Sequence, residues 1–208
     1  MKGKAMHHLL YTLLIVLTNN SDSLAVRIAY CLQGIRVSIL MNLWISVIAF
    51  AVTFLVSFYG SLIAGSLGAK LSSVIAMVIL VAIGSWMILE PYLKKRRLYK
   101  THRGNSTSLW DILQKPENAD MDHSKHIDFK EATLLGTALA LQNIGGSLSG
   151  GMIGLDPMLI AVLSAVVSFV IFWGGNYLSG FFVRRNLAGK AAVAGGILLI
   201  LIGLSQLP

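Results

Sequence analysis

A group of polar residues stands inside a stretch of chain that is otherwise apolar enough to cross a membrane. The group consists of Asn19, Asn20, Ser21, Asp22 and Ser23. A carboxylate at bilayer depth costs about 2.5 to 3.5 kcal/mol on insertion scales, so Asp22 needs a partner, an ion or a water-filled cavity. We interpret this group as the core of a cation-binding site.

A second polar group, in the later part of the chain, completes the predicted site. The run Ala-Leu-Ala-Leu-Gln-Asn-Ile-Gly-Gly can be aligned with Thr-Asn-Asn-Ser-Asp-Ser-Leu-Ala-Val, which sets Gln142 against Asp22. The predicted transport site comprises Asp22, Ser23, Gln142, Asn143, Asn19 and Asn20, with Asn42 and Asn176 as further oxygen donors. Of these, Asp22 and Asn143 are the predicted metal ligands. Oxygen donors of this kind suit Mg²⁺, Ca²⁺ and Mn²⁺.

A purely structural role remains an alternative for these residues. The amides would then hydrogen-bond between helices, which contributes about 0.6 kcal/mol per bond on average. Asp22 would pair with Arg27, whose long side chain is expected to snorkel to the cytoplasmic interface. Helix contacts of this kind explain the amides better than they explain Asp22.

A third constellation precedes the second polar group and resembles the twelve-residue EF-hand calcium loop. Its oxygen donors fall at the ligand positions of that loop: Asp120, Asp122, Ser124, the carbonyl of His126, Asp128 and Glu131. Lys125 stands where the loop requires glycine, and a side chain in the left-handed conformation costs roughly 1 to 2 kcal/mol. The loop is therefore a candidate site for Ca²⁺ or Mn²⁺.

Helix capping is the alternative explanation for part of this loop. Asp128 with Glu131 three residues later forms the pattern of a capping box at the start of a helix. Capping leaves Asp120 and Asp122 unexplained. If a cation binds, Glu131 couples it to the helix that carries Gln142.

The elements that position these residues are membrane helices. The chain has 208 residues, of which 55% are hydrophobic and 12% charged, and long runs lack any charge. Since a span needs about 20 apolar residues, we predict an all-α polytopic membrane protein with six transmembrane helices. Their predicted ranges are 8–29, 38–63, 71–89, 132–149, 158–182 and 191–207.

The six helices are predicted to form two inverted repeats. Residues 1–91 and 131–208 each hold three helices, an odd number, so the two halves enter the membrane from opposite sides. This architecture places a substrate site at the midplane between the halves. Residues 92–130 form a polar cytoplasmic loop between them.

Charge sets the expected orientation. Most of the 17 Lys and Arg residues fall in the loops after the first, third and fifth helices, which places these loops in the cytoplasm and both termini outside. The net charge of +8 is then a topology signal, and nucleic acid is not an expected partner. The expected partners are a divalent cation, the lipid bilayer and, as one option, a second copy of the chain in a homodimer.

Several stretches of the sequence resemble one transporter family. They are Asn-Ser-Asp22-Ser-Leu-Ala-Val with Ile-Ala-Tyr30, then Ile-Gly-Ser-Trp86, Ile-Leu-Gln-Lys-Pro116, Ala-Asp120-Met-Asp122 and Glu131-Ala-Thr-Leu-Leu-Gly-Thr-Ala-Leu. They are similar to the bacterial MntP-type manganese efflux pumps of the LysE exporter superfamily, in the branch resembling the sporulation protein YtaF. The resemblance spans nearly the whole chain.

The resemblance implies a six-helix transporter that moves Mn²⁺ outward. The family pattern has an aspartate in each half; here Asp22 matches the first, and Gln142 replaces the second. Small residues are usual in the family where Arg27 stands.

The sequence thus predicts an exporter in the bacterial inner membrane that exchanges a divalent cation for protons, with release when Asp22 is protonated. Two alternatives stay open: a non-transporting membrane sensor or scaffold that responds to a cytoplasmic cation, and an exporter of a small organic or amino-acid-like solute. No nucleophile, base and orienting group occur together, so we expect neither an enzyme nor an obligatory cofactor.

Overall fold

The computed structural model describes the backbone of residues 2–97, 119–122, 124–184 and 187–205. Its helices are α1 (Lys2–Asn19), α2 (Ser21–Gln33), α3 (Ile39–Leu67), α4 (Ala69–Arg97), α6 (Phe129–Gln142), α7 (Ile144–Met152), α8 (Pro157–Arg184) and α9 (Leu187–Leu204). Within these ranges there is no β-sheet; Arg36 and His126 form an isolated bridge between two connecting segments. Parts of the helices are described by backbone alone.

Two of the predicted helices are interrupted. The helix predicted over 8–29 is divided into α1 and α2 at Asn20, and the helix predicted over 132–149 is divided into α6 and α7 at Asn143. The predicted ranges do not mark either interruption. Polar side chains that compete for backbone groups, described below, account for the first interruption.

The third predicted helix also differs from expectation. Its predicted range ends at Leu89, two residues before Pro91, yet α4 continues through this proline to Arg97. Proline removes only its own backbone donor, and prolines within membrane helices are tolerated where neighbouring groups satisfy the freed carbonyl. The helix therefore extends beyond the predicted end at Leu89.

Among the residues that the structure describes, three segments are long and apolar enough to cross a membrane: Ile39–Leu67, Lys70–Leu89 and Pro157–Gly174. Only 22 to 28% of each segment is buried inside the protein, so something other than protein must cover the remaining apolar surface. Lipid is that cover, because it costs nothing to expose leucine and valine to hydrocarbon. The chain is an α-helical membrane protein.

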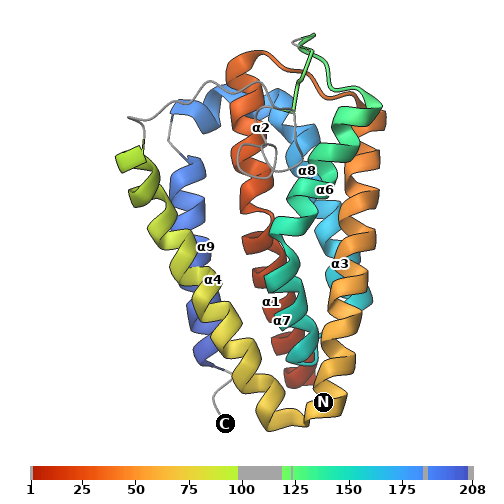
Figure 1. Ribbon diagram of the computed structural model, residues 1–208, viewed down its shortest axis with the longest axis vertical. Helices are drawn as coiled ribbons and strands as arrows, with labels where there is room; N and C mark the ends of the chain where they lie inside the picture. Colours follow the sequence, from red (N-terminus) through yellow and green to blue (C-terminus); the bar gives the residue numbers. More distant parts are fainter. Residues whose placement is uncertain (1, 98–118, 123, 185–186, 206–208) are drawn as a thin grey trace.

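The helices form an upright bundle (Figure 1). The contacts pair α3 with α8 and α4 with α9, while the short α6 and α7 lie against α3. The α2–α3 connection and residues 119–128 lie at one end of the bundle, where α4 and α8 also finish (Figure 1). The α3–α4 turn lies at the opposite end, together with the start of α1 and the end of α9.

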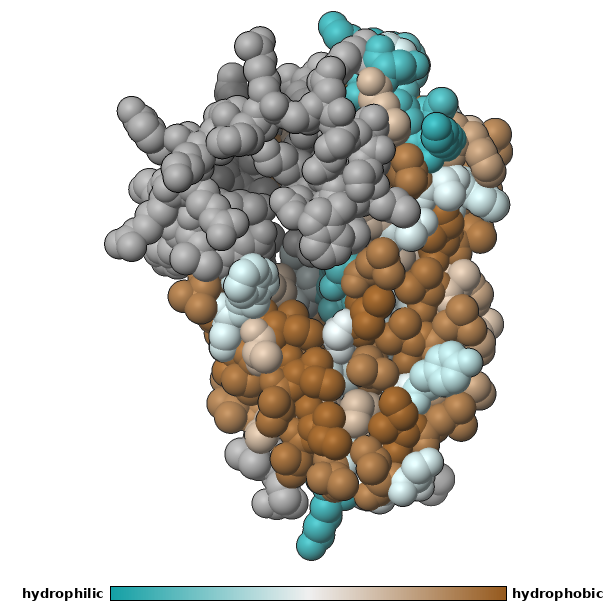
Figure 2. All heavy atoms as spheres, viewed as in Figure 1, coloured by the Kyte–Doolittle hydropathy of each residue, from teal (hydrophilic) through white to brown (hydrophobic). Residues whose placement is uncertain are grey.

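The surface is apolar along the helices. Large side chains are exposed at spacings of one helical turn, including Leu43, Val47, Leu55, Leu62, Val162, Val166 and Val170. Figure 2 shows hydrophobic residues over most of the coloured surface, with hydrophilic ones mainly near the end that carries residues 119–128. This distribution is typical of helices that face lipid.

The interior contains two separate apolar clusters. The loop-side cluster includes Val26, Tyr30, Ile45, Leu135, Leu139 and Phe172. The terminal-side cluster includes Ile15, Val16, Leu80, Leu155, Ile160 and Leu199. Each spans several helices.

Along α1–α2, α6–α7 and α8, buried polar residues stand between a residue of one cluster and a residue of the other. They are Asn19, Asn20, Ser21, Ser23, Asn143, Ser147, Ser164 and Ser168, which we call the polar belt. In α8, for example, Ser164 and Ser168 stand between Ile160 of the terminal-side cluster and Phe172 of the loop-side cluster. A soluble protein exposes its polar side chains; here polar side chains are buried between the apolar clusters, and large apolar side chains cover the outside.

Glycines bring α7 close to α3. A Cβ atom added at Gly151 would overlap the backbone carbonyl of Ser57, and one added at Gly60 would overlap that of Leu148. Small residues permit this close approach, which is a common basis of helix association in lipid.

The close approach predicts opposite effects for two Gly→Ala substitutions. Gly151→Ala should lower the melting temperature of the detergent-purified protein by several degrees, because overpacking typically costs about 1 to 3 kcal/mol. Gly65→Ala should leave it unchanged or raise it, since Gly65 lies in α3 with open space around it and alanine favours a helix by roughly 0.5 to 1 kcal/mol. Equal melting temperatures for both variants would contradict the close approach.

Candidate cation site

The interruption of the first span comes from side chains that bind its own backbone. Asn20 Nδ2 donates to the Val16 carbonyl at 2.9 Å. One residue later, Ser21 Oγ donates to the Leu17 carbonyl at 3.4 Å. Bonds from a side chain to the carbonyl four residues earlier weaken and bend helices. The helix is therefore weakened where the polar residues are concentrated, although the Asn20 N–H still donates to the Val16 carbonyl at 3.1 Å.

The two interrupted spans meet at this level. Asn19 Nδ2 donates to Ser147 Oγ at 3.5 Å, which joins the end of α1 to α7. A Cβ atom added at Gly146 would overlap the Asn19 carboxamide, so the glycine makes room for this side chain. Ser57 Oγ of α3 in turn donates to the Ser147 carbonyl at 3.0 Å. The structure thus joins Asn19 of the first polar group to Gly146 and Ser147, which follow Gln142 and Asn143 in the chain.

Asn143 marks the second interruption. Its backbone N–H donates to the carbonyls of Ala140 and Leu141 at the end of α6, and α7 begins directly after it. Asn143 is 8% exposed, and its side chain makes no capping hydrogen bond to α7. Gln142 is exposed in this structure. Of the two neighbouring amides at this interruption, Asn143 is buried and Gln142 is not.

Asp22 is placed by its backbone alone. It is the second residue of α2, and its side chain, like that of Asn176, lies outside the described residues. A carboxylate in the first turn of a helix is favoured by the helix dipole. The neighbouring Ser23 is buried.

The location of Arg27 corrects an expectation. Instead of reaching the membrane interface, its side chain is 1% exposed and lies inside the bundle. The physical reason is that α2 lies inside the bundle, in contact with both α8 and α9.

Several hydroxyl residues of the interior were missing from the predicted site. They are Ser46, Thr53, Ser57, Ser164 and Ser168, all buried. Thr53 and Ser57 stand four residues apart, as do Ser164 and Ser168, so each pair shares one helix face. This spacing within apolar runs was the available signal in the sequence.

The buried polar groups retain unused acceptors. Asn42 Nδ2 donates to the Phe169 carbonyl at 3.0 Å, whereas its Oδ1 is buried with no hydrogen-bond partner among the described residues. An unpaired acceptor in a dry interior is costly, and a cation would compensate for it. Carboxamide and hydroxyl oxygens in this environment can replace the water shell of a hard divalent ion.

The segment before α6 forms the predicted capping box. Asp128 accepts the backbone N–H of Glu131 at 2.8 Å, and Glu131 Oε2 accepts that of Asp128 at 3.1 Å. The capping alternative is thereby confirmed for these two residues. It leaves Asp120 and Asp122 outside the box, as the sequence indicated.

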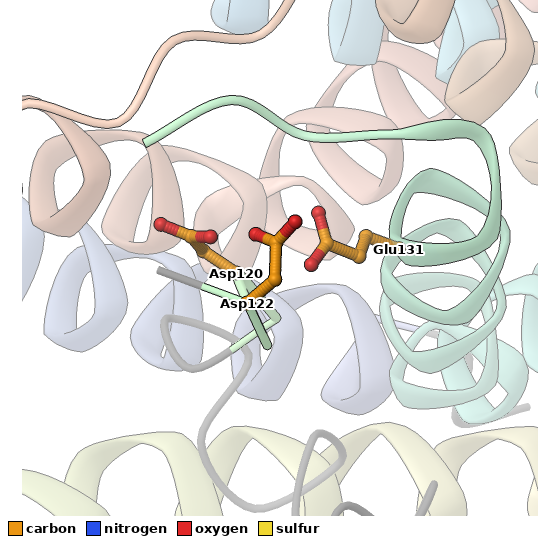
Figure 3. Close-up of side chains that lie close together, drawn as sticks. All are labelled: Asp120, Asp122 and Glu131. Atoms are coloured by element: carbon orange, nitrogen blue, oxygen red, sulfur yellow. The ribbon is translucent and has the colours of Figure 1, made fainter. Parts of the chain in front are cut away.

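Three carboxylates gather beside this box. Asp120, Asp122 and Glu131 each place an oxygen within 4.8 Å of the others, and Figure 3 shows the side chains in a row. The backbone N–H of Ser124 bonds to Asp122 and holds the pKa of its carboxyl below its ordinary value. Asp122 is therefore ionised at neutral pH, and its bond to Ser124 weakens only as the pH falls through that lowered pKa.

The remaining predicted loop ligands do not join this group in the structure. Ser124 Oγ donates to the His126 carbonyl at 2.9 Å, so these two oxygens are engaged with each other. Asp128 is occupied by the capping box. The predicted set of oxygens is thus reduced to the three carboxylates that face one another.

Comparison with known proteins agrees with the resemblance. A family model described as "Putative manganese efflux pump" matches residues 32–207, a range that excludes the polar residues 19–23. The chain is also similar to "Probable sporulation protein YtaF" of Bacillus subtilis (strain 168), with 28% identity over 204 residues, which covers 94% of this chain and 97% of the relative. No solved structure matches. The chain belongs to the MntP family of manganese efflux pumps.

Proposed function

We propose that this chain exports a divalent cation, first of all Mn²⁺, across the bacterial inner membrane in exchange for protons. The observation that carries the proposal is the meeting of two interrupted spans at a buried polar belt. Asn19 of the first span contacts Ser147 and Gly146 of the other. Interrupted helices that face each other at membrane depth are the usual setting of a transport site.

Two inverted repeats account for this arrangement. The first comprises α1–α2, α3 and α4, and the second comprises α6–α7, α8 and α9. In each repeat the interrupted helix comes first, so opposite orientations in the membrane bring the two interruptions to the same depth. Six spans with cytoplasmic basic loops and both termini outside follow from this arrangement and from the positive-inside rule.

Asp22 supplies the charge in the proposed site. Its position in the first turn of α2, next to buried Ser23, places the backbone of an acidic residue in the belt. Asn143 supplies a neutral oxygen from the opposite half, and Asn19 and Asn20 complete the near side. One carboxylate with several neutral oxygens favours Mn²⁺, Mg²⁺ or Ca²⁺ over softer ions.

Proton exchange follows from the use of a single acid. When the site opens to the outside, protonation of Asp22 removes the negative charge that holds the cation, and the ion leaves. Reopening to the cytoplasm releases the proton and restores the carboxylate. The buried acid therefore carries either the ion or the proton, which is the basis of exchange.

Asp22→Asn tests this role. The substitution keeps the size and the hydrogen-bonding oxygen but removes the charge, so ⁵⁴Mn²⁺ uptake into inverted vesicles should fall by at least about tenfold. Asp156→Asn is the matched control: Asp156 is exposed and caps α8 by accepting the N–H of Met158 at 2.8 Å, a role that asparagine can also perform. Its uptake should equal that of the wild type.

Undiminished uptake by Asp22→Asn would refute cation export through this residue. Uptake of a labelled amino acid, with no Mn²⁺ transport by the wild type, would instead identify the organic-solute exporter. The lumen of an inverted vesicle corresponds to the outside of the cell. An imposed pH gradient, acidic in that lumen, that fails to accelerate wild-type Mn²⁺ uptake would refute proton exchange.

The contact between the two spans gives a second test. Gly146→Ala should displace the Asn19 carboxamide and lower both the melting temperature and Mn²⁺ uptake. Adding Asn19→Ala removes the overlap, so the double variant should regain the melting temperature. It should not regain uptake, because the proposed ligand is missing. Recovery of both properties would show that Asn19 only packs against Gly146.

A further inference from the structure

The three carboxylates at the start of α6 form a second centre of negative charge, separate from the membrane site. Asp120 and Asp122 precede the helix and Glu131 lies in its first turn (Figure 3). None of the three forms an ion pair with a Lys, Arg or His among the residues that the structure describes. The three place oxygens within 4.8 Å of one another, and like charges this close repel unless a proton or a cation lies between them.

Asp120 gives the independent sign of a missing ligand. Its side chain is 7% exposed, and its Oδ1 is buried without a hydrogen-bond partner in the described part of the chain. A buried acceptor on an ionisable group is costly to leave unsatisfied. The carboxylate lies beside the other two in Figure 3 and places one oxygen within 4.8 Å of theirs, so a cation held among the three would bind a carboxylate whose hydrogen bonds are incomplete.

The backbone holds Asp120 in place through a strained residue. Lys125 has a φ of 63°, the left-handed conformation that costs roughly 1 to 2 kcal/mol for a residue with a side chain. In this conformation its backbone N–H donates to Asp120 Oδ2 at 3.1 Å. The turn therefore occupies one oxygen of Asp120 and leaves the other available.

The same turn is attached to the first half of the chain. Arg36 N donates to the Lys125 carbonyl at 2.8 Å, and Ile127 N donates to the Arg36 carbonyl at 3.1 Å. Ile127 is buried in the loop-side cluster together with Ile35 and Val37. The segment that carries Asp120 and Asp122 is thus held by backbone hydrogen bonds to Arg36 and by the burial of Ile127.

Glu131 can serve the capping box and a cation together. Its Oε1 accepts the N–H of Met121 at 2.7 Å, and its Oε2 accepts that of Asp128 at 3.1 Å. Each carboxylate oxygen has two lone pairs, so one acceptor position on each oxygen remains. Capping and cation binding are therefore compatible.

We propose that Asp120, Asp122 and Glu131 form a divalent-cation site outside the membrane-spanning part of the protein. Three carboxylates suit Ca²⁺ or Mn²⁺, with water completing the coordination. The bound ion would fix the start of α6 against the α2–α3 connection. If the proposed export function holds, binding of a cytoplasmic cation at this site would act on α6, the helix that Asn143 caps. The site itself does not depend on that function.

Equilibrium dialysis of the purified full chain with ⁵⁴Mn²⁺ or ⁴⁵Ca²⁺ tests the site. The Asp22→Asn protein serves as the background, since it lacks the charge of the membrane site. Adding Asp120→Asn and Asp122→Asn should weaken binding of at least one of these ions by tenfold or more. Adding Asp156→Asn, which removes a remote charge, should not change it.

Two controls keep the result interpretable. Circular dichroism without metal should show the carboxylate variants folded, because asparagine at 120 can still accept the Lys125 N–H. Glu131→Gln can keep the capping bond from the Asp128 N–H, as glutamine does in this box, although it gives up the bond from the Met121 N–H; it should weaken binding too. Equal affinity in the background and in all carboxylate variants would overturn the site.

The two proposals can fail separately. If Asp22→Asn exports Mn²⁺ normally but the Asp120 and Asp122 variants lose binding, the export mechanism fails and the second site stands. If Asp22→Asn abolishes export while the carboxylate variants bind as before, the second site fails and the mechanism stands.

Discussion

The constraint on which this structure depends is that polar side chains inside a lipid-facing bundle must find their partners within the protein. The apolar exterior offers them none, so hydroxyls and carboxamides bond to carbonyls of their own helix or of the next one. Asn20 bonds within its span, and Asn19 bonds across to Ser147. These bonds both break the helices and hold them together.

If every polar group of the polar belt had a hydrogen-bond partner, the belt would only hold the helices together. Pairing in the interior is incomplete: Asn42 Oδ1, outside the belt, has no hydrogen-bond partner among the described residues, and the Asn143 side chain makes no capping bond to α7. An acidic residue stands in the same region of the chain at Asp22. A buried acceptor without a partner is costly unless a ligand satisfies it, and the proposed cation site rests on this cost.

Helix capping and a concentration of carboxylates coincide at the start of α6. The capping box accounts for Asp128 and for part of the function of Glu131. It does not account for buried Asp120, whose neighbours are two further carboxylates. A segment stabilised by local hydrogen bonds thus also gathers charge, and its backbone pairing with Arg36 ties that charge to the other half of the chain.

The sequence by itself determined the features that arise from neighbouring residues. Apolar runs specify the helices, Asp128 and Glu131 specify the capping box, and the position of Lys125 specifies a left-handed turn, since each depends on local hydropathy or backbone geometry. Only the tertiary structure decided that Arg27 is buried, that Asn143 and not Gln142 lies inside, and that the Asn19 amide meets Ser147. These outcomes depend on which helices pack together, and contacts between distant segments leave no periodic trace along a single chain.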